Sequence, residues 1–259
     1  MVASRVLPAL AVAGILAGCV TTKETVFTNP PSPEEAVRQR VQLARNYIGD
    51  GNWDDAKRNL KLAVEMDERN AEIYEAFALI YQSTGEYELA EQNYRRAIAL
   101  DRDFSRARNN YAAFLFARER FAAAEAQLER VVKDTLYEAR PRAYINLGLC
   151  RVALDKRQLA EEAFTRALTM DRGNRIALLE LAQLRFAAGD YAGAGDYYTA
   201  YRAGVRRQSA RALWLGVRLA RATGDRDAEA SYGLALRNLY PESPEYAALQ
   251  RGQSAGGEP

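Results

Sequence analysis

The sequence predicts an all-α superhelical solenoid of about six helix-turn-helix repeats. Successive copies of one alanine are separated by 34, 34, 36, 34 and 36 residues, at Ala56, Ala90, Ala124, Ala160, Ala194 and Ala230. Self-similarity at a fixed period of about 20–50 residues is typical of stacked repeats. No segment alternates strictly between apolar and polar residues, so we expect essentially no β-strand.

The residues around each alanine alternate between large and small in the same order. The second copy contains Tyr74, Phe77, Ala78, Tyr81, Gly85, Tyr87, Ala90, Tyr94 and Ala97. The small residues allow two antiparallel helices to approach, and the aromatic residues fill the remaining space. A period of about 34 residues with this pattern is the signature of the tetratricopeptide (TPR) repeat. Such stacks have a concave groove that binds other proteins.

The segment before the repeats does not belong to the predicted fold. Residues 1–18 contain a short positive region and then about a dozen apolar residues. This run is too short to cross a hydrocarbon core of about 30 Å, so it predicts a lipoprotein signal peptide rather than a membrane span.

The end of this segment, Leu16-Ala17-Gly18-Cys19, is similar to the lipobox of bacterial lipoproteins. The alternative is an ordinary signal peptide whose cleavage region contains a cysteine. The similarity implies cleavage before Cys19 and a covalent lipid on that residue, and we expect no other cofactor. Val20 follows where an aspartate would favour inner-membrane retention, which implies an outer-membrane anchor on the periplasmic face.

The remaining organisation follows from helix signals. Residues 19–34 are expected to form a lipidated tether because their prolines oppose a helix. Ser32 and Pro33 predict the N-cap and first position of the first helix. A TPR domain is expected over residues 35–250, with repeats at about 37–70, 71–104, 105–140, 141–174, 175–209 and 210–243, a short helix near 244–250, and a disordered tail over 251–259.

Glycines mark the turn inside most repeats. A left-handed backbone is favourable there mainly for glycine. We expect this conformation at Gly51, Gly85, Gly189 and Gly224.

Composition argues against several classes of function. The chain has no histidine, which removes the commonest general base and the usual zinc ligand sets, and we predict neither catalytic residues nor a metal site. The 36 basic and 34 acidic residues are interleaved, so nucleic-acid binding has no support, and no small-molecule substrate is expected. With Cys19 assigned to lipid, Cys150 has no disulfide partner and is interpreted as a buried small apolar residue.

The concave groove is the candidate binding site. Helix positions that are not needed to hold a repeat together are expected to line it and to bind a short amphipathic or extended partner segment. The predicted groove residues are Arg106, Asn109, Phe116, Arg142, Ile145, Asn146, Leu149, Ile176, Leu179 and Gln183.

Two alternatives apply to this groove. Neighbouring helices or the curvature of the stack could instead cover its apolar residues, and Asn146 could serve packing between helices. The first two repeats are the second choice for the binding surface.

Several motifs outside the TPR positions resemble the PilF/PilW family of type IV pilus TPR lipoproteins, the pilotins of the secretin. They are the lipobox, the stretch 110–115, the two-residue lengthening of repeat three across 133–140, and Tyr240-Pro241-Glu242-Ser243. Thr135 departs from the proline expected after Asp134. The resemblance implies an outer-membrane lipoprotein that binds secretin subunits through its TPR groove and promotes their localisation and multimerisation for type IV pilus assembly.

Two other functions stay open at this point. One is a different periplasmic TPR scaffold lipoprotein, such as an adaptor for peptidoglycan enzymes or for outer-membrane protein assembly. The other is an enzyme or small-ligand protein, which would require a deep closed pocket with converging polar groups.

Overall fold

The computed structural model describes residues 32–255, and all regular elements in that range are α-helices. In chain order they are α1 (Pro33–Gly49), α2 (Trp53–Met66), α3 (Ala71–Thr84), α4 (Tyr87–Leu100), α5 (Ser105–Ala117), α6 (Phe121–Val131), α7 (Arg140–Ala153), α8 (Arg157–Met170), α9 (Arg175–Ala187), α10 (Tyr191–Ala203), α11 (Ala210–Thr223), α12 (Arg226–Leu239) and α13 (Pro244–Ala255). The predicted helical solenoid is confirmed. The signal peptide, Cys19 and most of the tether lie outside the described residues.

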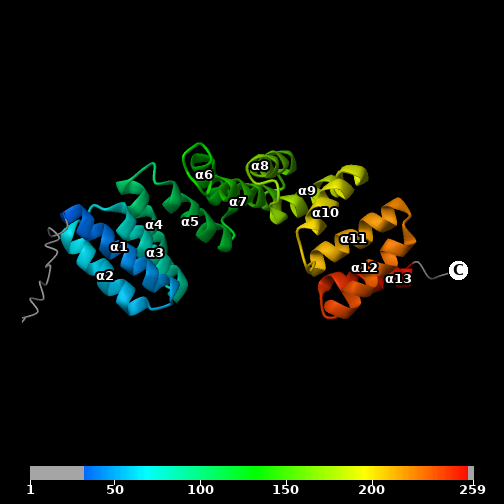
Figure 1. The fold of residues 1–259 in the computed structure, drawn as a ribbon, viewed down its shortest axis with the longest axis horizontal. Coiled ribbons are helices and arrows are strands. Elements are labelled where there is room, and N and C mark those ends of the chain that lie inside the picture. The colour runs from blue at the N-terminus through cyan, green and yellow to red at the C-terminus, as the bar shows by residue number, and fades with distance from the viewer. Residues whose placement is uncertain (1–31, 256–259) are drawn as a thin grey trace, which may run out of the picture.

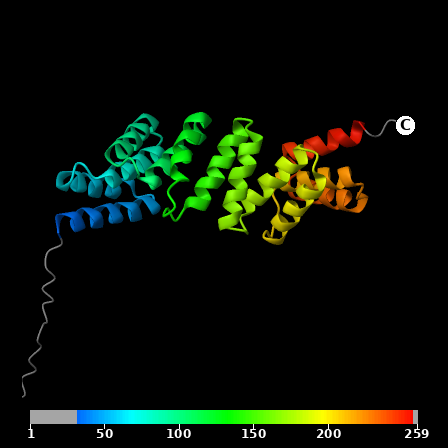
Figure 2. The same cartoon turned by 90° about the horizontal axis from the view of Figure 1, so that it is seen from above.

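Consecutive helices form pairs, and the pairs stack along one axis. Contacts run within pairs such as α3–α4 and between adjacent pairs such as α6–α7. The stack is curved, with α6 and α8 on its outer side and α5 and α7 on its inner side (Figure 1). Seen from above, the helices of the central pairs lie side by side across the long axis (Figure 2). The curvature gives the stack an inner face made by the first helices of its repeats, α3, α5, α7, α9 and α11.

The predicted alanines mark the helix contacts in five of the six repeats. Ala56, Ala90, Ala124, Ala160 and Ala194 have no solvent exposure. Gly148 serves the same purpose on α7, where an added Cβ would lie 2.5 Å from the ring of Phe164. The expectation is wrong for Ala230, which is exposed. In that last pair Leu213, Val217 and Leu236 form the contact, and α13 adds Leu249.

An aromatic cluster fills the space that the alanines leave in the second and third repeats. The rings of Tyr94 and Tyr111 stack with centroids 5.5 Å apart, and Phe114 lies 5.8 Å from Tyr94. The fully buried Tyr94 donates its hydroxyl to Gln82 Oε1 at 2.8 Å, so the polar end of this ring is paired. Large rings against small residues therefore build the core of each junction.

The turns follow the predicted glycine pattern. Gly51, Gly85, Gly189 and Gly224 have φ between +72° and +85°. Glu119 and Asp155 occupy the equivalent turns of the third and fourth repeats, with φ of 57° and 54°. The turn geometry is thus kept in all six repeats, even where a side chain makes the left-handed conformation less favourable.

The two ends differ in how well they match the expectation. Ser32 Oγ accepts a hydrogen bond from Glu35 N at 3.2 Å and Pro33 opens α1, as predicted. At the other end α13 continues to Ala255, so residues 251–255 are helical rather than disordered. Leu249, 3% exposed, anchors this helix in the last core cluster and lets it extend.

Ala90→Leu is expected to lower the free energy of unfolding by about 1–3 kcal/mol, because the larger side chain overpacks a contact with no free space. Ala230→Leu is the matched control and should change stability little, since Ala230 is exposed. Chemical denaturation followed by circular dichroism measures both. Equal effects would contradict the assignment of Ala90 to the helix contact.

Candidate partner-binding face

A row of equivalent side chains lies at the start of α5, α7 and α9 on the inner face. Arg106, Arg142 and Ile176 occupy the second position of their helices or the residue next to it. Ile176 is 51% exposed, and Arg142 is exposed as well. The side chains of these two residues are therefore open to solvent.

Three predicted groove residues are buried, and the expectation that they line an open surface is wrong. Asn109 is 2% exposed, Ile145 3% and Leu179 9%. Ile145 packs in one cluster with Phe164 and with Ala177 and Leu181 of the next repeat. The stacking of successive repeats covers this position, as the alternative interpretation allowed.

The other predicted residues are half-buried and already have contacts. The Phe116 ring lies edge-on to Phe121, with centroids 5.1 Å apart. Asn146 Nδ2 donates to Asn109 Oδ1 at 3.3 Å, so this amide serves packing between α5 and α7. Leu149 packs against the cluster of Ile145. Gln183 Oε1 accepts from Arg211 Nη2 at 2.6 Å.

A buried charge network joins the first three repeats at the inner face. Glu75 on α3 has no solvent exposure and accepts from Arg45 Nη2 at 2.5 Å and from Asn110 Nδ2 at 2.6 Å. Arg106 Nη2 donates to Glu72 Oε2 at 2.8 Å. The charge of Arg106 is thus compensated by Glu72 within the fold. The first role of Arg106 is therefore to join α5 to α3.

Arg45, Glu72 and Arg106 also line a depression of about 450 Å³ between α1, α3 and α5. Both Arg45 and Arg106 pair with Glu72 at this depression, so their charges are compensated within the fold. This depression lies on the repeats that were the second choice for partner binding.

The lengthened loop between α6 and α7 holds an apolar side chain in solvent. Leu136 is 90% exposed, the highest value among the exposed large apolar residues of the described chain. Asp134 fixes the loop, because its carboxylate accepts from Ser105 Oγ at 2.6 Å and from Leu136 N at 3.0 Å. The Ser105 hydrogen bond, first among several, holds the pKa of Asp134 below its ordinary value. The loop therefore displays Leu136 from a defined backbone.

Ion pairs bridge three successive junctions from the residue that follows each buried alanine. They are Glu91 with Arg120, Glu125 with Arg151, and Glu161 with Arg185. The hydrogen bond from Arg120 is the main cause that lowers the pKa of Glu91. The first junction reverses the signs, with Lys57 Nζ 3.9 Å from Glu86. These pairs join each of the first five repeats to its neighbour in that series.

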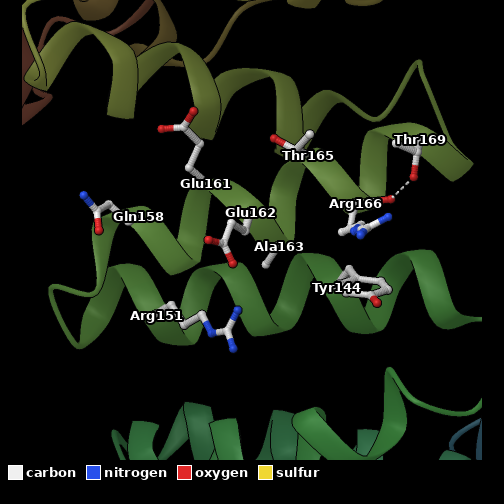
Figure 3. A pocket seen from close by; sticks show the side chains of 9 residues that line it. All are labelled: Tyr144, Arg151, Gln158, Glu161, Glu162, Ala163, Thr165, Arg166 and Thr169. Atoms are coloured by element: carbon white, nitrogen blue, oxygen red, sulfur yellow. Dashed lines mark hydrogen bonds between the residues drawn. The ribbon is translucent and has the colours of Figure 1, made fainter.

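A depression of about 690 Å³ lies over α7 and α8, and its nine lining residues are shown in Figure 3. Its side chains are spread along the two helices, and Arg151 is already bonded to Glu125 and Glu129. Residues 32–255 hold no group of three metal-ligating side chains. The residues that line this depression therefore form no cluster that resembles a catalytic site.

Cys150 is fully buried as predicted, and burial raises the pKa of its thiol to about 12.

Sequence reasoning missed the Glu75 network, the ion pairs between repeats and the exposure of Leu136. The sequence did contain a signal for the ion pairs, because a glutamate follows three of the periodic alanines, at Glu91, Glu125 and Glu161. The Glu75 network had none, since its members come from three repeats at different repeat positions. The lengthened loop was noticed only as a family marker.

The family models agree with this architecture. Two models described as tetratricopeptide repeat match the chain, one at residues 81–136 and the other at residues 41–103 and 145–209. No helix of the described residues is long and apolar enough to cross a bilayer. Together with the stacked pairs, these matches define a TPR solenoid.

Two relatives cover most of this chain. The type IV pilus assembly protein PilF of Pseudomonas aeruginosa is 38% identical over 236 residues, which are 91% of this chain and 93% of PilF. Its solved structure superposes with a TM-score of 0.80 and covers 86% of this chain and 100% of that one. The structure of PilW, described as a widely conserved type IV pilus biogenesis factor, is 27% identical with a TM-score of 0.71 and covers 83% of this chain and 99% of that one. The chain belongs to the PilF/PilW family of type IV pilus biogenesis TPR proteins.

Glu75→Gln is expected to destabilise the protein by about 3 kcal/mol, because it leaves the Arg45 guanidinium without its buried counter-charge. Glu72→Gln is the matched control one turn earlier on α3. The Glu72 side chain is 47% exposed, and its loss should change stability by less than about 1 kcal/mol. Urea denaturation of both variants measures the difference, and similar midpoints would remove the special role of Glu75.

Proposed function

We propose that this protein is a lipoprotein of the outer membrane, anchored on its periplasmic face through Cys19, and that it binds secretin subunits for type IV pilus assembly. It promotes their localisation and multimerisation. The observation that carries the proposal is the similarity to PilF, which extends over nine-tenths of both chains. The lipobox and the stacked TPR repeats supply the anchor and the binding face that such a role requires.

Lipidation supports the location. Three acyl chains exceed the two membrane signals needed for stable anchoring, at about 0.8 kcal/mol per buried CH₂. The proline-rich residues after Cys19 extend at about 3.1 Å per residue if they adopt polyproline geometry, which would place the solenoid roughly 30–50 Å from the bilayer.

The partner surface is best placed where apolar side chains remain exposed on and beside the inner face. Ile176 and Leu136 meet this condition, and the exposed Arg142 adds a positive charge near the start of α7. Covering apolar surface gains about 25 cal/mol per Å². The network around Glu75 and the ion pairs between repeats hold these side chains in fixed relative positions, so a partner segment meets a preformed surface.

Cys19→Ser is expected to remove the anchor, because serine cannot accept the thioether-linked lipid. The variant should appear as a longer uncleaved or soluble form that no longer floats with outer membranes in a density gradient. Wild-type protein in the inner-membrane fraction would contradict the sorting argument from Val20. A variant that still floats with outer membranes would show that protein contacts hold it there.

Ile176→Glu and Leu136→Asp are expected to reduce secretin multimers in outer-membrane fractions by tenfold or more, on the order of one lost apolar anchor. Leu234→Glu on α12 is the matched control, because Leu234 is 49% exposed and far along the chain from both sites. Helicity and membrane flotation should not change in any of the three.

Normal multimers in both test variants would exclude this surface. Co-purification from solubilised envelopes tests the proposed role itself. A secretin in the tagged fraction supports the pilotin role, whereas peptidoglycan hydrolases or outer-membrane assembly proteins would indicate a different periplasmic scaffold.

A further inference from the structure

The surface between α9 and α11 contains hydrogen-bond donors that the fold does not satisfy. Arg218 Nε and Gln183 Nε2 are both buried and have no partner. A buried donor without an acceptor costs free energy, so such groups usually have a ligand or ordered water. The two lie on facing helices, Gln183 on α9 and Arg218 on α11.

Arg218 is held between two aromatic rings and not by an acid. Its guanidinium carbon lies 4.6 Å from the ring centre of Phe186 and 5.9 Å from that of Trp214. The pairs within 4 Å in residues 32–255 include no carboxylate for Arg218. Burial and then the charge of Arg211 lower the pKa of Arg218, because both disfavour a second cation here.

The neighbouring arginine shows what Arg218 lacks. Arg211 Nη1 donates to Glu180 Oε1 at 2.5 Å, and Arg211 Nη2 donates to Glu180 Oε2 at 2.8 Å. This bidentate pair gives Arg211 a counter-charge within the fold. Two turns further along α11, Arg218 is half-buried and faces the ring of Phe186 on α9, whereas the exposed Arg211 faces the carboxylate of Glu180.

Two of the other arginines that lie over rings differ from Arg218 in their exposure. Arg96 and Arg207 lie over Tyr74 and Tyr240, yet both are exposed to water. Hydration therefore compensates their charge. Arg218 is half-buried, so an anion supplied from outside would gain more there than at an exposed arginine.

We propose that the surface formed by Gln183, Phe186, Arg211, Trp214 and Arg218 binds a polypeptide segment that presents a carboxylate to Arg218 and Gln183. An apolar side chain next to that carboxylate covers the two aromatic rings. A polypeptide fits better than a small anion, because the rings add an apolar surface that a free anion cannot use. The inference deepens the proposed function by naming the chemistry of the bound segment.

A pooled peptide library tests this site without any assumption about the natural partner. Its central residue is Asp, Glu, Asn or Gln, and the flanking positions vary among apolar residues. The full-length protein, immobilised in mild detergent, selects from the pool, and sequencing counts the survivors. Wild type should enrich Asp and Glu over Asn and Gln by about tenfold, the ratio expected for one charge-assisted hydrogen-bonded pair.

Arg218→Gln should abolish this enrichment, and Arg218→Lys should retain part of it. Arg207→Gln is the matched control, because Arg207 also stacks on a ring but is exposed. It should enrich acidic peptides as wild type does. Thermal unfolding followed by circular dichroism confirms that all variants are folded.

A second readout locates the bound peptide. The chain has two tryptophans, so Trp53→Phe leaves Trp214 as the only fluorophore of its kind. A selected acidic peptide should change its emission saturably. Equal recovery of acidic and amide peptides, or enrichment that survives Arg218→Gln, would overturn the proposal. If the selection enriches acidic peptides but no secretin co-purifies from envelopes, the carboxylate-binding site is supported. That result would reject only the secretin as the partner.

Discussion

The close approach of two helices at an alanine or glycine is the contact on which the rest of this structure depends. Ala90 has no exposure, and Gly148 leaves no space for even one added carbon against Phe164. Because this contact recurs at a nearly constant interval, each helix pair has the same shape and stacks on the next in the same way. The curved inner face is a consequence of that repetition, and so is the row of side chains along it.

Most of the charged side chains described on the inner face are paired with other residues of the stack. Glu75 is enclosed by Arg45 and Asn110, and Glu180 is held by both terminal nitrogens of Arg211. A partner therefore meets a surface whose charges are largely compensated. Only the few polar groups that lack a hydrogen-bond or ion-pair partner can interact with it strongly. Specificity in such a case comes from few positions, because the paired groups lose as much on desolvation as they gain.

Much of the fold was predictable because it depends on local patterns with a fixed period. The helix contact at Ala90 and the left-handed turn at Gly85 each follow from a residue type at a fixed place in its repeat. The candidate site was less predictable. The position of Ile145 within its repeat indicates that it can contact α8 of the same repeat. That position alone does not indicate that α9 of the next repeat also covers its side chain. The prediction that Ala230 is buried failed for a related reason, because α13 alters the contacts of the last helix pair.

The series of ion pairs that starts from the residue after each alanine ends before the last junction, where Glu180 on α9 pairs instead with Arg211 on α11. Gly195 follows the fifth alanine where Glu161 follows the fourth, and the last junction adds aromatic contacts such as Tyr198 with Tyr232, whose ring centroids are 5.9 Å apart. Salt screens exposed pairs such as Arg185 with Glu161 but leaves ring packing unaffected. Concentrated salt would thus weaken exposed pairs such as that of Arg185 more than the last junction, where the Glu180 side chain is 6% exposed and aromatic rings add to the contact.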